Sequence, residues 1–150
     1  MAFVFILDNR SILSVELLCF LTWDAVMETE QFEMGLMQPT TDLKPCLRRL
    51  HLGVTALREF LQALETYSRL THLSSEDHDK IVALRGKLPA IRDLRHLFLL
   101  QLRHYNPVIQ SRRYLRDIIT TNHVLILSLE RAIQQSCYEV IISSSPSGGT

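Results

Sequence analysis

Residues that could bind a metal are present in this 150-residue sequence, but few of them are grouped. The six histidines include no pair spaced by four residues and no HExxH motif, so the zinc-binding pattern of a helix is missing. One loose cluster remains, in which His72 and His78 stand near Glu76, Asp77 and Asp79. Because acidic residues favour the start of a helix, we interpret this cluster as a capping region and expect no metal.

Motifs for covalent catalysis and for nucleotide binding are also missing. The sequence has no GxSxG, no P-loop and no GxGxxG, and its three cysteines, Cys19, Cys46 and Cys137, form no CxxC. An odd number of widely spaced cysteines argues against a disulfide framework and fits a reducing compartment. We therefore expect no enzyme, no catalytic residue, no cofactor and no small-molecule substrate.

Arginine side chains are the strongest candidates for binding, because the guanidinium group suits phosphate. The sequence is neutral overall, yet residues 1–43 carry one arginine against seven acids, and residues 44–131 carry fifteen basic residues against eight acids. The aromatic residues, 7% of the chain, do not alternate with the arginines, so the stacking pattern of single-strand binding is missing. The candidate contacts to duplex phosphates are Arg92, Arg95, Arg103, Arg112, Arg113 and Arg116. Arg48 and Arg49 could line the same surface. The alternative is a set of solvated faces with acidic partners.

Asn122 and His123 interrupt the apolar part of "SRRYLRDIITTNHVLILSLE". Helical spacing places one set of residues on a single face: Leu115, Ile118, Ile119, Asn122, Ile126, Leu129 and Ile133. We expect that face to be buried, with Asn122 and His123 forming a structural polar seam that is hydrogen-bonded to a neighbour. Replacing Asn122 by Leu would then cost about 1–3 kcal/mol.

The elements that position these residues are expected to be helices. The periodicity predicts helices over residues 8–27, 42–70, 74–88, 89–105 and 106–137, with an acidic connector, "METEQFEMGLMQPTT", after the first. The first helix is apolar on nearly all sides, which is typical of a buried helix. Leucines at spacings of three and four give the second its apolar stripe. Ser74 and Asp77 form a capping box at the start of the third.

Short connections between long helices predict an all-α fold of antiparallel helical hairpins, an armadillo/HEAT-like α-solenoid segment. We expect a helical domain over residues 1–138 and a disordered Ser/Gly-rich tail over residues 139–150. The apolar runs near the start are too short, or too interrupted by charge, to span a bilayer, so no membrane segment is predicted.

Two stretches of the sequence resemble the Timeless family of replication fork-protection proteins, which has a relative in the insect circadian clock. These are "LRRLHLGVTALREFLQALETYSRLTHLSSEDHDKI" and "LRHLFLLQLRHYNPVIQSRRYLRDIITTNHVLILSLE". The resemblance covers about residues 42–132 and implies a short segment of a large, all-helical, non-enzymatic nuclear scaffold. It implies Tipin, Claspin and other replisome proteins as partners, and contact with duplex DNA. The implied roles are fork protection, checkpoint signalling and DNA repair, or alternatively regulation of the circadian clock.

Overall fold

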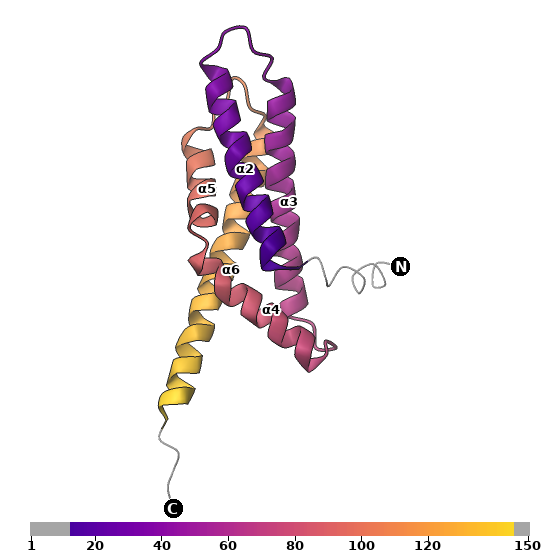
Figure 1. The fold of residues 1–150 in the computed structure, drawn as a ribbon, viewed down its shortest axis with the longest axis vertical. Helices are drawn as coiled ribbons and strands as arrows, with labels where there is room; N and C mark the ends of the chain where they lie inside the picture. Colours follow the sequence, from indigo (N-terminus) through magenta and orange to yellow (C-terminus); the bar gives the residue numbers. More distant parts are fainter. Residues whose placement is uncertain (1–12, 146–150) are drawn as a thin grey trace, which may run out of the picture.

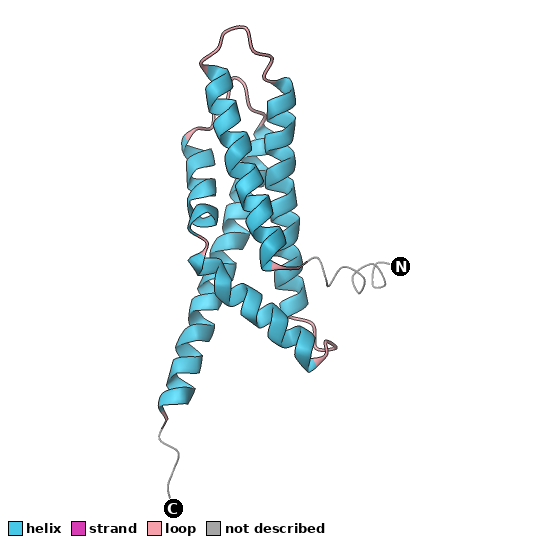
Figure 2. Ribbon diagram, in the orientation of Figure 1, coloured by secondary structure: helices cyan, strands magenta, loops and turns pink. Residues whose placement is uncertain are grey.

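All regular elements are helices in the computed structural model, which describes residues 13–145 (Figure 2). In chain order they are α2 (Val15–Leu36), α3 (Lys44–Ser68), α4 (Ser75–Lys87), the 3-10 turn η2 (Leu88–Ala90), α5 (Arg92–Arg103) and α6 (Arg112–Ser144). The prediction of an all-α fold is therefore confirmed. None of these helices is long and apolar enough to cross a bilayer.

Helices α2 and α3 form an antiparallel hairpin, closed by a loop at the upper end of the molecule (Figure 1). Helix α6 packs along α3, and α5 contacts both α2 and α6. Helix α4 crosses the lower end at an angle, and the last turns of α6 extend past the bundle (Figure 1). The stacking of further hairpins into a solenoid stays a prediction.

Helix α3 supplies the centre of the core through its leucine stripe. Leu50, Leu57, Leu61 and Leu64 are buried, as the periodicity predicted. On the α2 side the buried residues include small ones, and Ala25 lies 3.6 Å from the position that a Cβ atom would take at Gly53. The two helices therefore approach closely where glycine faces alanine.

Helix α2 differs from its prediction in length and in burial. It continues to Leu36 through the stretch predicted as a connector, because Glu, Gln and Met are strong helix formers and Phe32 extends the buried stripe. It is also not buried all round, because Phe20 and Trp23 are more than half exposed. The predicted start, residues 8–12, lies outside the described residues.

Helix α6 begins later and ends later than predicted. Asn106 and Pro107 lie in a turn, where the Asn106 Oδ1 accepts from the Val108 N–H at 3.0 Å, and the helix starts after Ser111. The predicted boundary at residue 138 is wrong, because the helix runs to Ser144 with no glycine or proline to stop it. Residues 146–150 of the predicted tail lie outside the described residues.

The predicted third and fourth helices are also refined by the structure. The Ser74 Oγ accepts from the Asp77 N–H at 3.2 Å, as the capping box predicted. The Ser74 hydroxyl in turn donates to the Asp77 carboxylate at 2.9 Å. Pro89 lies in η2, so the predicted helix over residues 89–105 becomes a 3-10 turn followed by α5.

Candidate interaction surfaces of the bundle

The contact between α3 and α6 is held by a nearly buried carboxylate. Asp117 on α6 accepts hydrogen bonds from the His51 Nε2 at 2.5 Å and from the Arg58 Nη1 at 2.6 Å. Burial would raise the pKa of Asp117, but the His51 hydrogen bond and the Arg58 charge together outweigh it and lower that pKa. The ring of Tyr114 meets that of His51 edge-on, with centroids 5.6 Å apart. Asp117 therefore stays ionised and fixes two basic side chains of α3.

A groove opens beside this cluster, between α3 and the first turns of α6. Its hollow has a volume of about 490 Å³ and is lined by Arg48, His51, Leu52, Thr55, Arg58, Arg113 and Asp117. Three arginines face it against one carboxylate, so the lining is positively charged. Among residues 13–145, Arg48 and Arg113 make no ion pair. This positive groove is thus lined by two basic side chains that the fold does not neutralise.

A second buried carboxylate joins α3, α4 and α6 lower in the bundle. Glu65 on α3 pairs with Arg131 on α6 and lies 3.7 Å from the Arg85 Nη2 on α4. The Ser128 hydroxyl also donates to the Glu65 Oε1 at 3.0 Å. Since all three partners come from other helices, Glu65 acts as a structural joint and leaves little charge for a ligand.

The six arginines predicted to contact duplex phosphates lie on two helices. Arg92, Arg95 and Arg103 are exposed on α5, and the other three are exposed in the first two turns of α6. Of these six, only Arg113 lines the positive groove. Its basic companions there, Arg48 and Arg58, come from α3. Arg48 was predicted to line the basic surface without being among the six predicted contacts, and Arg58 was not predicted.

The polar seam between α6 and its neighbour is real, but it does not contain Asn122 and His123. The structure places His123 in an exposed position and Asn122 in a half-buried one. The buried polar residues of α6 are Asp117, Thr121 and Ser128. The predicted buried face is therefore correct for Ile118 but not for Asn122, and the ion pairs of Asp117 and Arg131 join α6 to α3.

Only part of the face predicted to be buried is buried. Ile118 is fully buried and Leu129 packs against the core, whereas three isoleucines of that face form an exposed apolar stripe. Ile119, Ile126 and Ile133 recur every seven residues along α6, and each is more than half exposed. A shallow apolar hollow of about 340 Å³ lies on this stripe, between Ile126 and Ile133. Regular exposure of β-branched apolar residues over two heptads is typical of a helix face that docks a partner. We call these three residues the α6 stripe.

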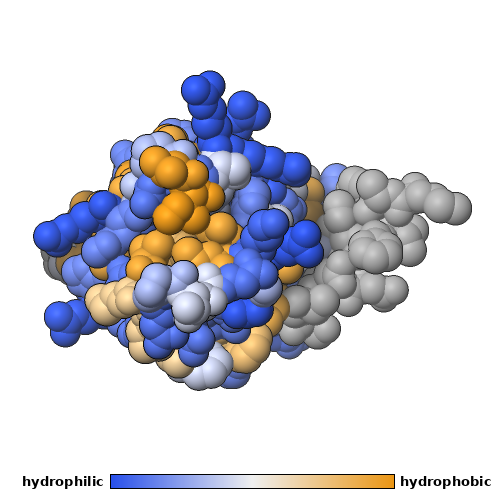
Figure 3. Space-filling view, turned by 90° about the horizontal axis from the view of Figure 1, so that it is seen from above, coloured by the Kyte–Doolittle hydropathy of each residue, from blue (hydrophilic) through white to orange (hydrophobic). Residues whose placement is uncertain are grey.

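Apolar surface is also visible at the upper end of the bundle. Seen from above, hydrophobic side chains lie within a largely hydrophilic surround (Figure 3). Phe20 and Trp23 add exposed aromatic area on α2, with ring centroids 6.3 Å apart. Large exposed side chains on both α2 and α6 therefore leave two outer helices without full cover.

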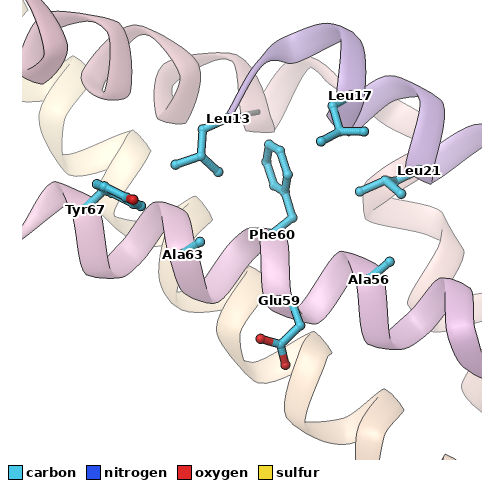
Figure 4. A pocket seen from close by; sticks show the side chains of 8 residues that line it. All are labelled: Leu13, Leu17, Leu21, Ala56, Glu59, Phe60, Ala63 and Tyr67. Carbon is cyan, nitrogen blue, oxygen red and sulfur yellow. The ribbon is translucent and has the colours of Figure 1, made fainter. Parts of the chain in front are cut away.

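A small apolar hollow of about 240 Å³ lies between the lower halves of α2 and α3. In Figure 4, Leu13, Leu17 and Leu21 point across it toward Phe60, while Glu59 turns away from the leucines. Tyr67 lies at one end of the hollow, and its remaining lining is mostly aliphatic or aromatic.

The described residues contain no group of side chains suited to metal binding. Between residues 13 and 145, no three His, Cys, Asp or Glu side chains come together in a way that could hold a metal ion. His72 and His78 are exposed beside the start of α4, where Ser74 and Asp77 cap the helix. The acids of this region therefore act locally on the helix terminus.

Similarity to known proteins covers most of the chain. It is 48% identical over 81% of its length to "Protein timeless" of Drosophila hydei, and 47% identical over 80% to "Protein timeless" of Drosophila melanogaster. It is 28% identical over 69% of its length to "Protein timeless homolog" of Homo sapiens. The chain spans only 18%, 9% and 8% of the lengths of these three relatives. No family model matches the chain.

Proposed function

The chain belongs to the Timeless family, as a short segment of it, and we propose that this segment is a non-enzymatic, protein-binding part of a nuclear scaffold. The observation that carries the proposal is the α6 stripe, in which Ile119, Ile126 and Ile133 are each more than half exposed. Covering such side chains with a partner stabilises a complex by about 25 cal/mol for each Å² of apolar surface removed from water. A scaffold role needs docking faces of this kind and no catalytic residues.

The partners proposed from the family resemblance are Tipin and Claspin, together with other replisome proteins. In that setting the segment supports fork protection, checkpoint signalling and DNA repair. The rigid bundle would present the α6 stripe to one partner helix, because stripes with a seven-residue repeat pack best against another helix.

A pull-down with purified Tipin tests this proposal. We expect the folded chain to capture Tipin, and the double substitution Ile126→Glu/Ile133→Glu to abolish capture. Leu99→Glu is the matched control, because Leu99 is equally exposed but lies on α5. Absence of capture by the folded wild-type chain would overturn the Tipin assignment, and equal loss in the control would overturn the role of the α6 stripe.

Regulation of the circadian clock is the second candidate. It is favoured by the higher identity to the two insect proteins, 48% and 47%, than to the human one, 28%. A clock role predicts that protein abundance cycles daily in constant darkness. A fork-protection role predicts chromatin association during S phase at every time of day.

Direct binding of duplex DNA is a further candidate, through the exposed arginines between Arg92 and Arg116. Phosphate contacts release counterions, so affinity for duplex DNA should fall steeply with salt. The substitution Arg112→Ala/Arg113→Ala should reduce both the affinity and its salt dependence. Salt-independent binding, or none, would remove this candidate.

A further inference from the structure

The positive groove between α3 and α6 has features of a binding site that its packing role does not explain. Asp117 is fully engaged by His51 and Arg58, so the one carboxylate of the groove is already neutralised. Arg48 and Arg113 then remain as two uncompensated charges on opposite helices, Arg48 on α3 and Arg113 on α6. The two positive charges of these guanidinium groups, which line one hollow, would be neutralised by a ligand with two negative charges.

Among biological dianions, a phosphate monoester fits this arrangement best. A phosphorylated side chain carries about −1.5 to −2 charges at neutral pH and offers three acceptor oxygens. Guanidinium groups bind such oxygens in pairs, with short charge-assisted hydrogen bonds. The Asp117 cluster holds Arg58 and His51 in fixed positions at the wall of the groove, which lowers the entropy lost on binding.

A phosphodiester of duplex DNA fits the groove less well. Each of its phosphates carries a single charge, and a duplex needs cations spread along a surface. Here the cations converge on one hollow, and neither of the neighbouring arginines, Arg112 and Arg116, lines it.

The shape of the groove favours a phosphate that is carried by a polypeptide. From Arg48 to Arg58 the α3 wall runs about 15 Å, at about 1.5 Å per residue, which is long enough for a short extended segment. Leu52 lies midway along this wall with 66% of its surface exposed. It offers apolar contact to a residue beside the phosphorylated one, which a free phosphate would not use.

We propose that this groove binds a phosphoserine or phosphothreonine of a protein partner, with Arg48 and Arg113 as the phosphate ligands. The inference names one kind of partner for the scaffold proposed above and rests on that function. It makes partner binding at this site dependent on phosphorylation, whereas docking on the α6 stripe is not.

Nuclear magnetic resonance titration of the full chain with N-acetyl-phosphoserine amide tests the proposal directly. We expect saturable shifts at the backbone amides of Arg48–Arg58 and of Arg113–Asp117, and none with N-acetyl-serine amide. Arg48→Ala/Arg113→Ala should weaken binding at least ten-fold. Arg95→Ala/Arg103→Ala is the matched control and should bind as the wild type does, because both residues are exposed on α5 outside the groove.

Three results would overturn the proposal. They are the absence of saturable shifts in the groove, equal binding by the groove and control variants, and displacement of phosphoserine amide by a short duplex DNA that binds the same residues more tightly. All four substituted arginines are exposed, so a circular dichroism spectrum should show every variant folded. Because this titration needs no Timeless partner, its failure is distinguishable from a failure of the Tipin pull-down.

Discussion

Replacing Asp117 by Asn should destabilise the bundle by separating α3 from α6. The substitution keeps the shape of the side chain but removes the charge that His51 and Arg58 share. Two hydrogen bonds to a charged group are worth about 1.5–3 kcal/mol each. The His51 and Arg58 side chains are 27% and 22% exposed, so solvent screening moves the total toward the lower end. An asparagine oxygen can still accept from Arg58, and we therefore expect a loss of about 2–3 kcal/mol.

Urea denaturation followed by circular dichroism measures this loss. A free energy of unfolding of about 5–15 kcal/mol is usual for a domain, so the change is large enough to resolve. It corresponds to a fall in melting temperature of about 4–12 °C for a chain of this size. Asp79→Asn is the control, because Asp79 is exposed on α4. If both variants unfold within about 0.5 kcal/mol of the wild type, Asp117 does not hold the helices together.

The pH dependence gives the same prediction a second readout. The folded pKa of Asp117 lies below its ordinary value of 3.8, so folding favours the ionised form. The stability that this provides is fully present above that ordinary value. It is lost as the pH falls through the lowered pKa. The difference in the free energy of unfolding between the wild type and Asp117→Asn should therefore shrink as the pH falls below that ordinary value. A difference that vanishes near neutral pH would refute the assignment of the effect to this carboxylate.

Five further substitutions probe other parts of the fold, each by urea denaturation. Gln101→Leu should stabilise the chain by about 1–2 kcal/mol, because both amide atoms of Gln101 are buried without a partner in the described part of the chain. A loss of stability would mean that the amide is hydrogen-bonded. Ser74→Ala should cost about 1 kcal/mol through loss of the α4 cap, and an unchanged midpoint would discount that cap. Leu125→Ala should cost about 2–5 kcal/mol, whereas Ile126→Ala, on the exposed α6 stripe, should cost less than about 0.5 kcal/mol. Equal costs would show that the stripe is covered. Asn122→Leu should now be nearly neutral, within about 0.5 kcal/mol, and a loss above 1 kcal/mol would restore the original seam.

Local sequence rules predicted the parts of the fold that depend on local physics. The leucine stripe of α3 and the Ser74 cap of α4 follow from helical spacing and from unsatisfied backbone N–H groups, and both were found as predicted. The length of α2 was missed because polar residues with high helix propensity were read as a connector. Apolar periodicity was given more weight than the helix propensity of these polar residues. Phe32 nevertheless continues the buried stripe, because it follows the buried Ala25 by seven residues.

The candidate site could not be predicted to the same extent, because it depends on contacts between distant residues. His51 and Asp117 are 66 positions apart, and Arg58 and Asp117 are 59 apart. No local sequence pattern predicts that Asp117, and not another aspartate, will bind His51 and Arg58 on another helix. The sequence singled out both Arg113 and Arg48 as basic surface residues, but only the packing of α3 on α6 brings them to one groove.

Helix α6 shows why apolar periodicity alone misassigned the buried face. Ile119, Ile126 and Ile133 are exposed, while the bundle buries a mixed face of Tyr114, Asp117, Ile118, Thr121, Leu125, Ser128 and Ala132. Burying isoleucine would gain about 1.5–3 kcal/mol for each side chain, so leaving three of them exposed is costly unless another surface covers them. On this inward face Asp117 and Ser128 also hydrogen-bond to charged partners on α3, so its polar groups are satisfied. The inward face of α6 thus fixes the geometry of this bundle, and the exposed α6 stripe supports the proposed docking of a partner.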